Sequence, residues 1–336
     1  MKNRIEYIDL AKGICISLVV LWHVLRDLAE NIDFIQIMFF FRMPLYFILS
    51  GMFFKTYNNF LGFTKKKTNK LLIPFIFSLL FIAIPSVFFL DYMNGTNTTF
   101  NSFTDDKGRM YMGIAPSSWF LLCLFQVNLY FFFIHYISKQ NIKLIIFLCI
   151  FLGLLGYLIN SCGLYLPLWF DTSLTVMPFF LCGYLLRNSS DILYESFSKK
   201  HVTQFLISLS VLLISFYILE HHHLKALSFY HNDFKIKIVS LYIGGISGSY
   251  VILMISKYIK RLPIISYIGR YSIVVLLTHQ PLLFLIRNIL YQFRITADTI
   301  IDNLAIYAFI ILISVPIIKF CIRYLPYLFA QKDLLK

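Results

Sequence analysis

The chain has 336 residues, of which 59% are hydrophobic and 14% charged. A soluble domain is about half apolar and about a quarter charged, so this composition excludes an ordinary soluble protein and indicates a polytopic membrane protein. The formal net charge of +14 would suggest a nucleic-acid partner in a soluble protein, but no long polar segment could form a basic domain, so nucleic-acid binding is discounted.

Ten stretches are long and apolar enough to cross a membrane, which takes about 17–25 residues each. In chain order they are 8–28, 34–54, 71–90, 117–137, 142–160, 168–187, 202–219, 238–256, 263–290 and 300–322. The stretches 168–187 and 263–290 are the least regular, and the second is expected to break near Pro281 or to follow an interfacial segment. We predict an all-α integral membrane protein with about ten transmembrane helices in one bundle, a single domain over residues 1–336 with no separate soluble domain.

Basic residues are unevenly divided between the two sides that these spans define. With the N-terminus inside, most of the 30 Lys and Arg residues fall on the cytoplasmic side. Because Lys and Arg accumulate in cytoplasmic loops, this bias places both termini in the cytoplasm. The longest polar stretch, residues 91–116, is then expected on the outer side and is too short for a typical independent domain.

The first span carries several ionisable residues. Lys12 and His23 are 11 residues apart, which is about three helical turns, so they share one face and lie roughly 16 Å apart along the axis. Ionisable groups inside a membrane are costly and usually face the bundle interior or a wet cavity. Asp9, Arg26 and Asp27 lie near the ends of the span, where their side chains could reach the interface instead. His23 is deep and short, so it is a candidate functional residue.

Two further spans contain deep polar groups. Arg42, in the second span, lies too deep for an ordinary interface anchor and is expected to face the same cavity as His23. The pair Ser50-Gly51 permits close approach of another helix. His279, in the ninth span, lies near mid-membrane, and two deep histidines on different helices suggest one site inside the bundle.

The basic segment GFTKKKTNKLLIP, residues 62–74, has two interpretations that the sequence leaves open. It is either ordinary cytoplasmic charge attracted to anionic lipid or a cluster of lysines that holds a phosphorylated cytosolic ligand. The segment EHHHLK, residues 220–225, invites a metal hypothesis, but three consecutive histidines cannot all face one ion on a regular helix. No metal is expected.

These residues resemble acyltransferase family 3, the integral-membrane acyltransferases, and especially its stand-alone members that O-acetylate bacterial surface sugars. The similarity is carried in order along the chain by YIDLAKGICISLVVLWH, FRMPLYFILSG, KKTNKLLIP, SSWFLLCLF, MPFFLCGYLLR and YIGRYSIVVLLTHQP. The opening signature separates a basic residue from a histidine by ten residues; the family commonly has Arg where this chain has Lys12, which keeps the charge but loses the bidentate fork.

The resemblance implies an acyl-CoA-dependent transferase with about ten helices in the bacterial cytoplasmic membrane. His23 would be catalytic, with His279 as a second candidate. Acetyl-CoA would be the acyl donor and a sugar or polysaccharide, free or lipid-linked, the acceptor. The phosphates of acetyl-CoA would be held by basic residues near the cytoplasmic face, Lys12, Lys66, Lys67 and Lys70, and the deeper Arg42 would line the path of the bound donor.

The leading hypothesis is therefore acyl transfer, most simply acetyl transfer, to a sugar hydroxyl. Because a hydroxyl is a poor nucleophile at neutral pH, His23 would take its proton, or would itself carry the acyl group briefly. The chief alternative is a transporter or glycan flippase, since deep histidines and a polar seam also suit proton-coupled transport. A third alternative is a non-catalytic subunit of a polysaccharide-assembly complex, but this alternative leaves the deep histidines unexplained.

Overall fold

The structure is a computed structural model that describes residues 5–26, 28, 33–57, 59–93, 104, 110, 113, 116–187, 197–221, 228–232 and 238–335. Asp27, most of the long polar stretch 91–116 and most of the EHHHLK segment lie outside these residues. Within them the secondary structure is helical, without a β-strand, so the prediction of an all-α integral membrane protein is confirmed.

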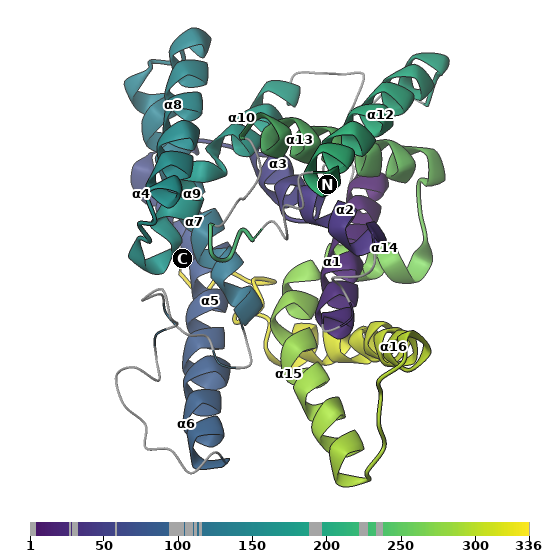
Figure 1. Ribbon diagram of the computed structural model, residues 1–336. Coiled ribbons are helices and arrows are strands. Elements are labelled where there is room, and N and C mark those ends of the chain that lie inside the picture. The colour runs from purple at the N-terminus through teal and green to yellow at the C-terminus, as the bar shows by residue number, and fades with distance from the viewer. Residues whose placement is uncertain are drawn as a thin grey trace.

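The helices follow one another along the whole chain (Figure 1). The α-helices are α1 (Glu6–Leu25), α2 (Asp33–Phe41), α3 (Pro44–Met52), α4 (Phe60–Lys67), α5 (Ile73–Ser78), α6 (Ile84–Met93), α7 (Trp119–Ile137), α8 (Ile142–Ser161), α9 (Phe170–Thr175), α10 (Met177–Leu186), α12 (Lys199–His221), α13 (Ile238–Ile259), α14 (Pro263–Arg270), α15 (Ser272–Gln292) and α16 (Ile300–Tyr324). Two π-helical turns, η2 (Thr68–Leu72) and η3 (Leu79–Ala83), and two 3₁₀ turns, η5 (Pro116–Ser118) and η6 (Pro167–Trp169), complete the list.

Eight of the described helical segments are long and apolar enough to cross a membrane, and the bent pair Pro167–Thr175 and Met177–Leu186 makes a ninth if it is one span. The pair meets at 49°, in the stretch that the sequence marks as irregular. The second predicted span, 34–54, is divided between α2 and α3, because the α-helix is interrupted at Arg42 and Met43, just before Pro44.

The ninth predicted span also consists of two helices. It begins with the short helix α14, and the interruption falls at Tyr271, between α14 and α15. Pro281 lies inside α15 without ending it. The expectation of a preceding segment is therefore confirmed, while the break near Pro281 is absent because α15 continues through the proline.

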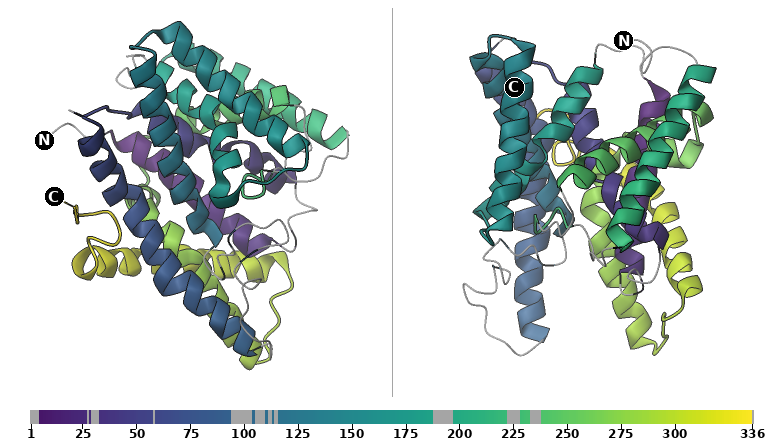
Figure 2. Two further views of the ribbon diagram at one scale, coloured as in Figure 1. Left: turned by 90° about the vertical axis from the view of Figure 1, so that its left-hand side faces the viewer. Right: turned by 45° about the horizontal axis from the view of Figure 1, so that its top comes forward.

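Helix α1 is central to one part of the bundle, where it packs against α13, α14, α15 and α16. Helices α4 to α8 form the other side, and their ribbons lie apart from those of α15 and α16 in both Figure 1 and the right-hand view of Figure 2. Side chains bridge this gap, since the rings of Phe89 on α6 and Phe284 on α15 have centroids 6.5 Å apart. A site between α1, α7 and α15 therefore lies at the junction of the two parts.

Glycines permit the closest helix contacts. A Cβ atom on Gly269 of α14 would lie 1.9 Å from the carbonyl oxygen of Asp9 on α1, so only glycine fits at this crossing. Likewise a Cβ on Gly51 of α3 would lie 2.0 Å from the Phe180 carbonyl oxygen on α10. The close approach predicted for Ser50-Gly51 is thus present, and such small-residue contacts are how membrane helices pack without a hydrophobic driving force.

Candidate active site

His23 lies where α1 meets the start of α7 and the middle of α15. Its Nε2 atom is 3.2 Å from the Ser117 hydroxyl. The side-chain nitrogen of Gln280 lies 3.1 Å from His23 Nδ1 and 3.3 Å from Nε2. Ser117 is buried in the turn η5, and its backbone N–H donates to Gln280 Oε1 at 2.8 Å.

The direction of these hydrogen bonds follows from the Ser117 backbone. Because its N–H can only donate, the carbonyl end of the Gln280 amide must face Ser117 and the NH₂ end must face His23. A ring nitrogen that accepts from this NH₂ carries no proton. The contact therefore suits a neutral His23 ring, the form in which imidazole can act as a base.

His279 is adjacent to Gln280 on α15, and its ring centroid lies 5.2 Å from that of His23. The two deep histidines therefore lie side by side, and their role in one site stays a prediction. His279 is only 1% exposed, and its Nδ1 donates to the Val275 carbonyl oxygen at 2.8 Å. In a neutral ring Nε2 then holds the lone pair, and this buried atom has no hydrogen-bond partner within the part of the chain that the structure describes. A buried acceptor left unpaired costs about 1–3 kcal/mol, so a substrate hydroxyl here would satisfy it.

An apolar cavity of about 240 Å³ lies beside α1, and two lysines line it, Lys12 of α1 and Lys67 of α4. The phenol of Tyr46, another lining residue, donates to the Lys12 carbonyl oxygen at 2.9 Å and ties α3 to α1. The structure therefore places two of the predicted phosphate-binding residues on one cavity, although they are more than fifty positions apart in the sequence.

The cavity also extends to the helical turn before the histidine cluster. Val19 of α1 and Leu276 of α15 line it. Four residues further along each helix, which is about one turn, come His23 and Gln280. The cavity thus runs between helices from the lysines to the turn before His23, and neither His23 nor His279 is among its lining residues.

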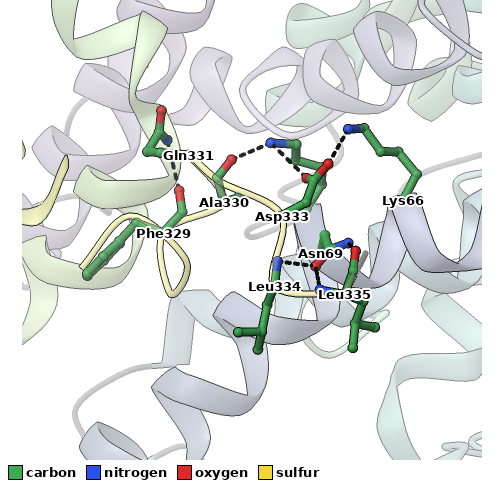
Figure 3. Close-up of polar contacts among 9 residues, drawn as sticks. Lys66, Asn69, Phe329, Ala330, Gln331, Asp333, Leu334 and Leu335 are labelled. Atoms are coloured by element: carbon green, nitrogen blue, oxygen red, sulfur yellow. Dashed lines mark hydrogen bonds and ion pairs between the residues drawn. The ribbon is translucent and has the colours of Figure 1, made fainter. Parts of the chain in front are cut away.

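The lysines of the basic segment 62–74 lie on two different faces of the helix. Lys67 lines the cavity, whereas Lys66 and Lys70 lie on another face and contact Asp333 of the C-terminal segment (Figure 3). The division follows from helical geometry, because neighbouring positions point about 100° apart while positions four apart point the same way. The π-turn η2, which begins at Thr68, widens the helix at this motif; such turns often occur at functional sites.

Arg42 is 8% exposed, and its guanidinium lies 4.3 Å from the ring centroid of Trp22 and 4.3 Å from that of Phe39. Its Nη1 is buried and has no hydrogen-bond partner among the described residues. Arg42 does not line the cavity of Lys12 and Lys67. Trp22 precedes His23, and the centroids of their rings are 4.4 Å apart. Arg42 therefore reaches the site through Trp22. Direct contact between Arg42 and the acyl donor stays a prediction.

Ser117 and Gln280 are the residues that sequence reasoning missed. Both lie in quoted motifs, SSWFLLCLF and THQP, but uncharged polar residues are common in membrane helices and carry no signal alone. Contact with His23 is what distinguishes them. Within the described ranges no group of three or more His, Cys, Asp and Glu residues could hold a metal ion.

Comparison with known proteins decides the family. A model of an acyltransferase domain matches residues 5–319, which is nearly the whole chain and includes every element of the site described above. The chain belongs to acyltransferase family 3. It is therefore a membrane acyltransferase. No curated protein and no solved structure matches the chain, so donor and acceptor must be argued from the site.

Proposed function

We propose that this acyltransferase moves an acetyl group from acetyl-CoA to a hydroxyl of a cell-surface or exopolysaccharide sugar, free or lipid-linked, in the bacterial cytoplasmic membrane. The observation that carries the proposal is the cavity, with Lys12 and Lys67 among its lining and the His23 cluster one turn beyond it. The basic and the apolar parts of the cavity wall match an acyl donor that has a charged end and an uncharged, chain-like thioester arm.

The lysines form the end of the site that binds the acyl donor. Lys ammonium groups act as mobile point charges toward phosphate, without the fixed fork that Arg offers. Lys12 and Lys67 can therefore hold phosphate groups at the cavity, while its apolar walls accept the thioester arm. Basic residues inside a span are costly to place, so their position at the cavity indicates a functional role.

The histidines supply the acid–base chemistry. The sugar hydroxyl gives its proton to His23 Nε2 or Nδ1 while its oxygen attacks the thioester carbonyl carbon, so that a C–O bond forms and the C–S bond breaks. The leaving CoA thiolate then takes the proton from the imidazolium, which restores neutral His23. Ser117 and Gln280 hold the neutral ring in place before the proton moves, and the Gln280 NH₂ releases the ring nitrogen that takes the proton, because two donors cannot pair. The unpaired Nε2 of His279 can accept a hydrogen bond from the acceptor sugar.

The test is transfer of label from acetyl-CoA to the native glycan by the purified, detergent-solubilised protein. His23→Ala should reduce the rate about 10²–10⁴-fold, the usual contribution of a general base. His135→Ala is the matched control, because His135 lies near the other end of α7, outside the cavity. If His23→Ala folds and keeps the wild-type rate, the assignment of His23 is wrong.

The same assay separates the enzyme from a transporter. Stoichiometric release of the CoA thiol on glycan addition means group transfer, whereas saturable glycan movement across vesicles without thiol release means transport. Labelled donor without acceptor also separates a base from an acyl carrier: general-base catalysis leaves the protein unlabelled, while a covalent route labels His23 or a neighbour such as Ser117.

A further inference from the structure

The C-terminal segment, residues 325–335, follows α16 and folds back over α4 and η2 (Figure 3). Phe329 is 3% exposed and packs on Phe77, with ring centroids 5.5 Å apart. Ala330, 5% exposed, has a φ of 59°, which turns the chain toward the basic motif. The segment is thus anchored by an apolar contact before it reaches the lysines.

Asn69 of the π-turn η2 forms hydrogen bonds with the backbone at the end of this segment. It is 2% exposed, and its Oδ1 accepts from the backbone N–H groups of Leu334 and Leu335, both at 2.8 Å. Its Nδ2 donates to the Leu335 carbonyl oxygen at 2.9 Å. One buried side chain therefore satisfies three backbone groups and fixes the residues that follow Asp333.

Asp333 lies between two lysines of the motif. Its Oδ2 is 2.6 Å from Lys66 Nζ, and its Oδ1 is 3.6 Å from Lys70 Nζ. Lys70 also donates to the Ala330 carbonyl oxygen. The hydrogen bond from Lys66, with the charges of both lysines, holds the pKa of the Asp333 carboxyl below its ordinary value. An anionic group of this chain therefore lies where two lysines would otherwise be open to a phosphate.

The exposure of the three side chains indicates that this contact can open. The side chains of Lys66, Lys70 and Asp333 are 39%, 38% and 35% exposed, so water and ions reach the pair and compete with it. The segment also lies beyond residue 319, where the family match ends, so it is not part of the matched acyltransferase domain. By contrast Lys67, in the same motif, belongs to the cavity wall.

We propose that residues 325–335 form an inhibitory gate at the donor end of the site, in which Asp333 occupies Lys66 and Lys70 until a phosphate group of the acyl-CoA displaces it. The inference rests on the proposed function, because it takes acyl-CoA as the ligand. Lys66 and Lys70 then draw the donor to the motif, and Lys67, one position along, receives it at the cavity.

The first experiment follows release of the segment without catalysis. Trypsin is applied to the full-length protein, and cleavage after the exposed Lys332 is measured with CoA, with inorganic pyrophosphate, or with potassium chloride at equal ionic strength. CoA and pyrophosphate should speed cleavage about threefold or more over the chloride control. Cleavage that is unchanged or slower with CoA overturns the gate.

The second experiment removes the charge of the gate. Asp333→Asn should lower KM for acetyl-CoA about threefold, which is about 0.7 kcal/mol at 1.4 kcal/mol per tenfold, and leave kcat unchanged. Glu6→Gln is the matched control, because Glu6 also pairs with a basic residue, Arg261 at 3.7 Å, and its loss removes the same charge away from the motif. An unchanged or raised KM in Asp333→Asn overturns the proposal.

The two proposals fail separately. If the enzyme transfers no acetyl group from acetyl-CoA, the proposed function is wrong, whatever trypsin reports. If it transfers acetyl but neither Asp333→Asn nor CoA changes KM or cleavage after Lys332, only the gate is wrong. Truncation after Leu325 gives a third measurement, and it should lower KM at least as much as Asp333→Asn.

Discussion

Replacement of Gln280 by methionine tests whether its amide positions His23. Methionine has nearly the same length and volume but can neither donate to the imidazole nor accept from the Ser117 N–H. The apolar packing of the side chain is therefore largely kept. What is lost is the pair of hydrogen bonds that links η5, α15 and α1.

The magnitude follows from counting these bonds. Each is worth about 0.5–1.5 kcal/mol net, and the buried Ser117 N–H would be left without its acceptor at about 1–3 kcal/mol. Loss of the hydrogen bond that orients the neutral His23 ring corresponds to about 1 kcal/mol, or roughly fivefold in rate; freedom of the ring to rotate away adds to this. We expect kcat to fall about 10- to 100-fold, with KM for acetyl-CoA within about twofold, because the lysines are untouched.

The assay is initial-rate kinetics together with thermal unfolding in detergent. Gln126→Met is the matched control, because Gln126 is also buried in the bundle and hydrogen-bonds Ser173 and the Leu168 carbonyl oxygen, away from the cavity. It should cost similar stability and leave kcat intact. A folded Gln280→Met protein with kcat within twofold of wild type would show that Gln280 does not position His23.

Three further predictions concern the donor end, the helix packing and the gate. Lys67→Met should raise KM for acetyl-CoA roughly tenfold, about 1.4 kcal/mol, with little change in kcat, because it removes a phosphate contact and not the base; an unchanged KM would remove Lys67 from the donor site. Gly269→Ala should lower the unfolding temperature, at a cost of about 1–3 kcal/mol, because its Cβ would lie 1.9 Å from the Asp9 carbonyl oxygen; unchanged stability would contradict the close crossing. Lys66 lowers the pKa of the Asp333 carboxyl. The ionised carboxylate therefore stabilises the docked C-terminal segment at every pH above the ordinary aspartate range, and this stabilisation is lost as the pH falls through the lowered pKa. The protection factors of the backbone amides of residues 329–335, which correct for the intrinsic pH dependence of exchange, should thus stay constant from about pH 5 to 8 and fall only in stronger acid; loss of protection near neutral pH would mean that another group controls docking.

Helical periodicity made part of the site predictable. Lys12 and His23 share one helix, so their spacing alone puts them on one face, and the structure places the cavity and the histidine cluster along that face. His279 was predictable as a partner because a deep ionisable residue in a membrane span must face the interior. Within a helix, geometry is local and sequence determines it.

Contacts between helices were not predictable in the same way. The sequence does not distinguish Ser117 and Gln280 from other polar residues, since their role arises only where η5, α15 and α1 meet. Arg42 was expected to face the cavity, but the stacking of its guanidinium on Trp22 and Phe39 depends on how α1 and α2 cross. Such contacts depend on packing, which joins residues that are far apart in the chain.

By itself, then, the sequence determined the all-helical membrane character, most of the spans, and the stripe of Lys12 and His23, because hydrophobic length and helical period are local properties. The packing of the helices, in contrast, sets which residues contact His23 and which lysine of the 62–74 segment faces the cavity. It alone brought Asp333 back over Lys66 and Lys70, more than 260 positions earlier in the chain. No periodicity encodes a contact of that range, because it depends on where α16 and the π-turn η2 come to lie in the folded bundle.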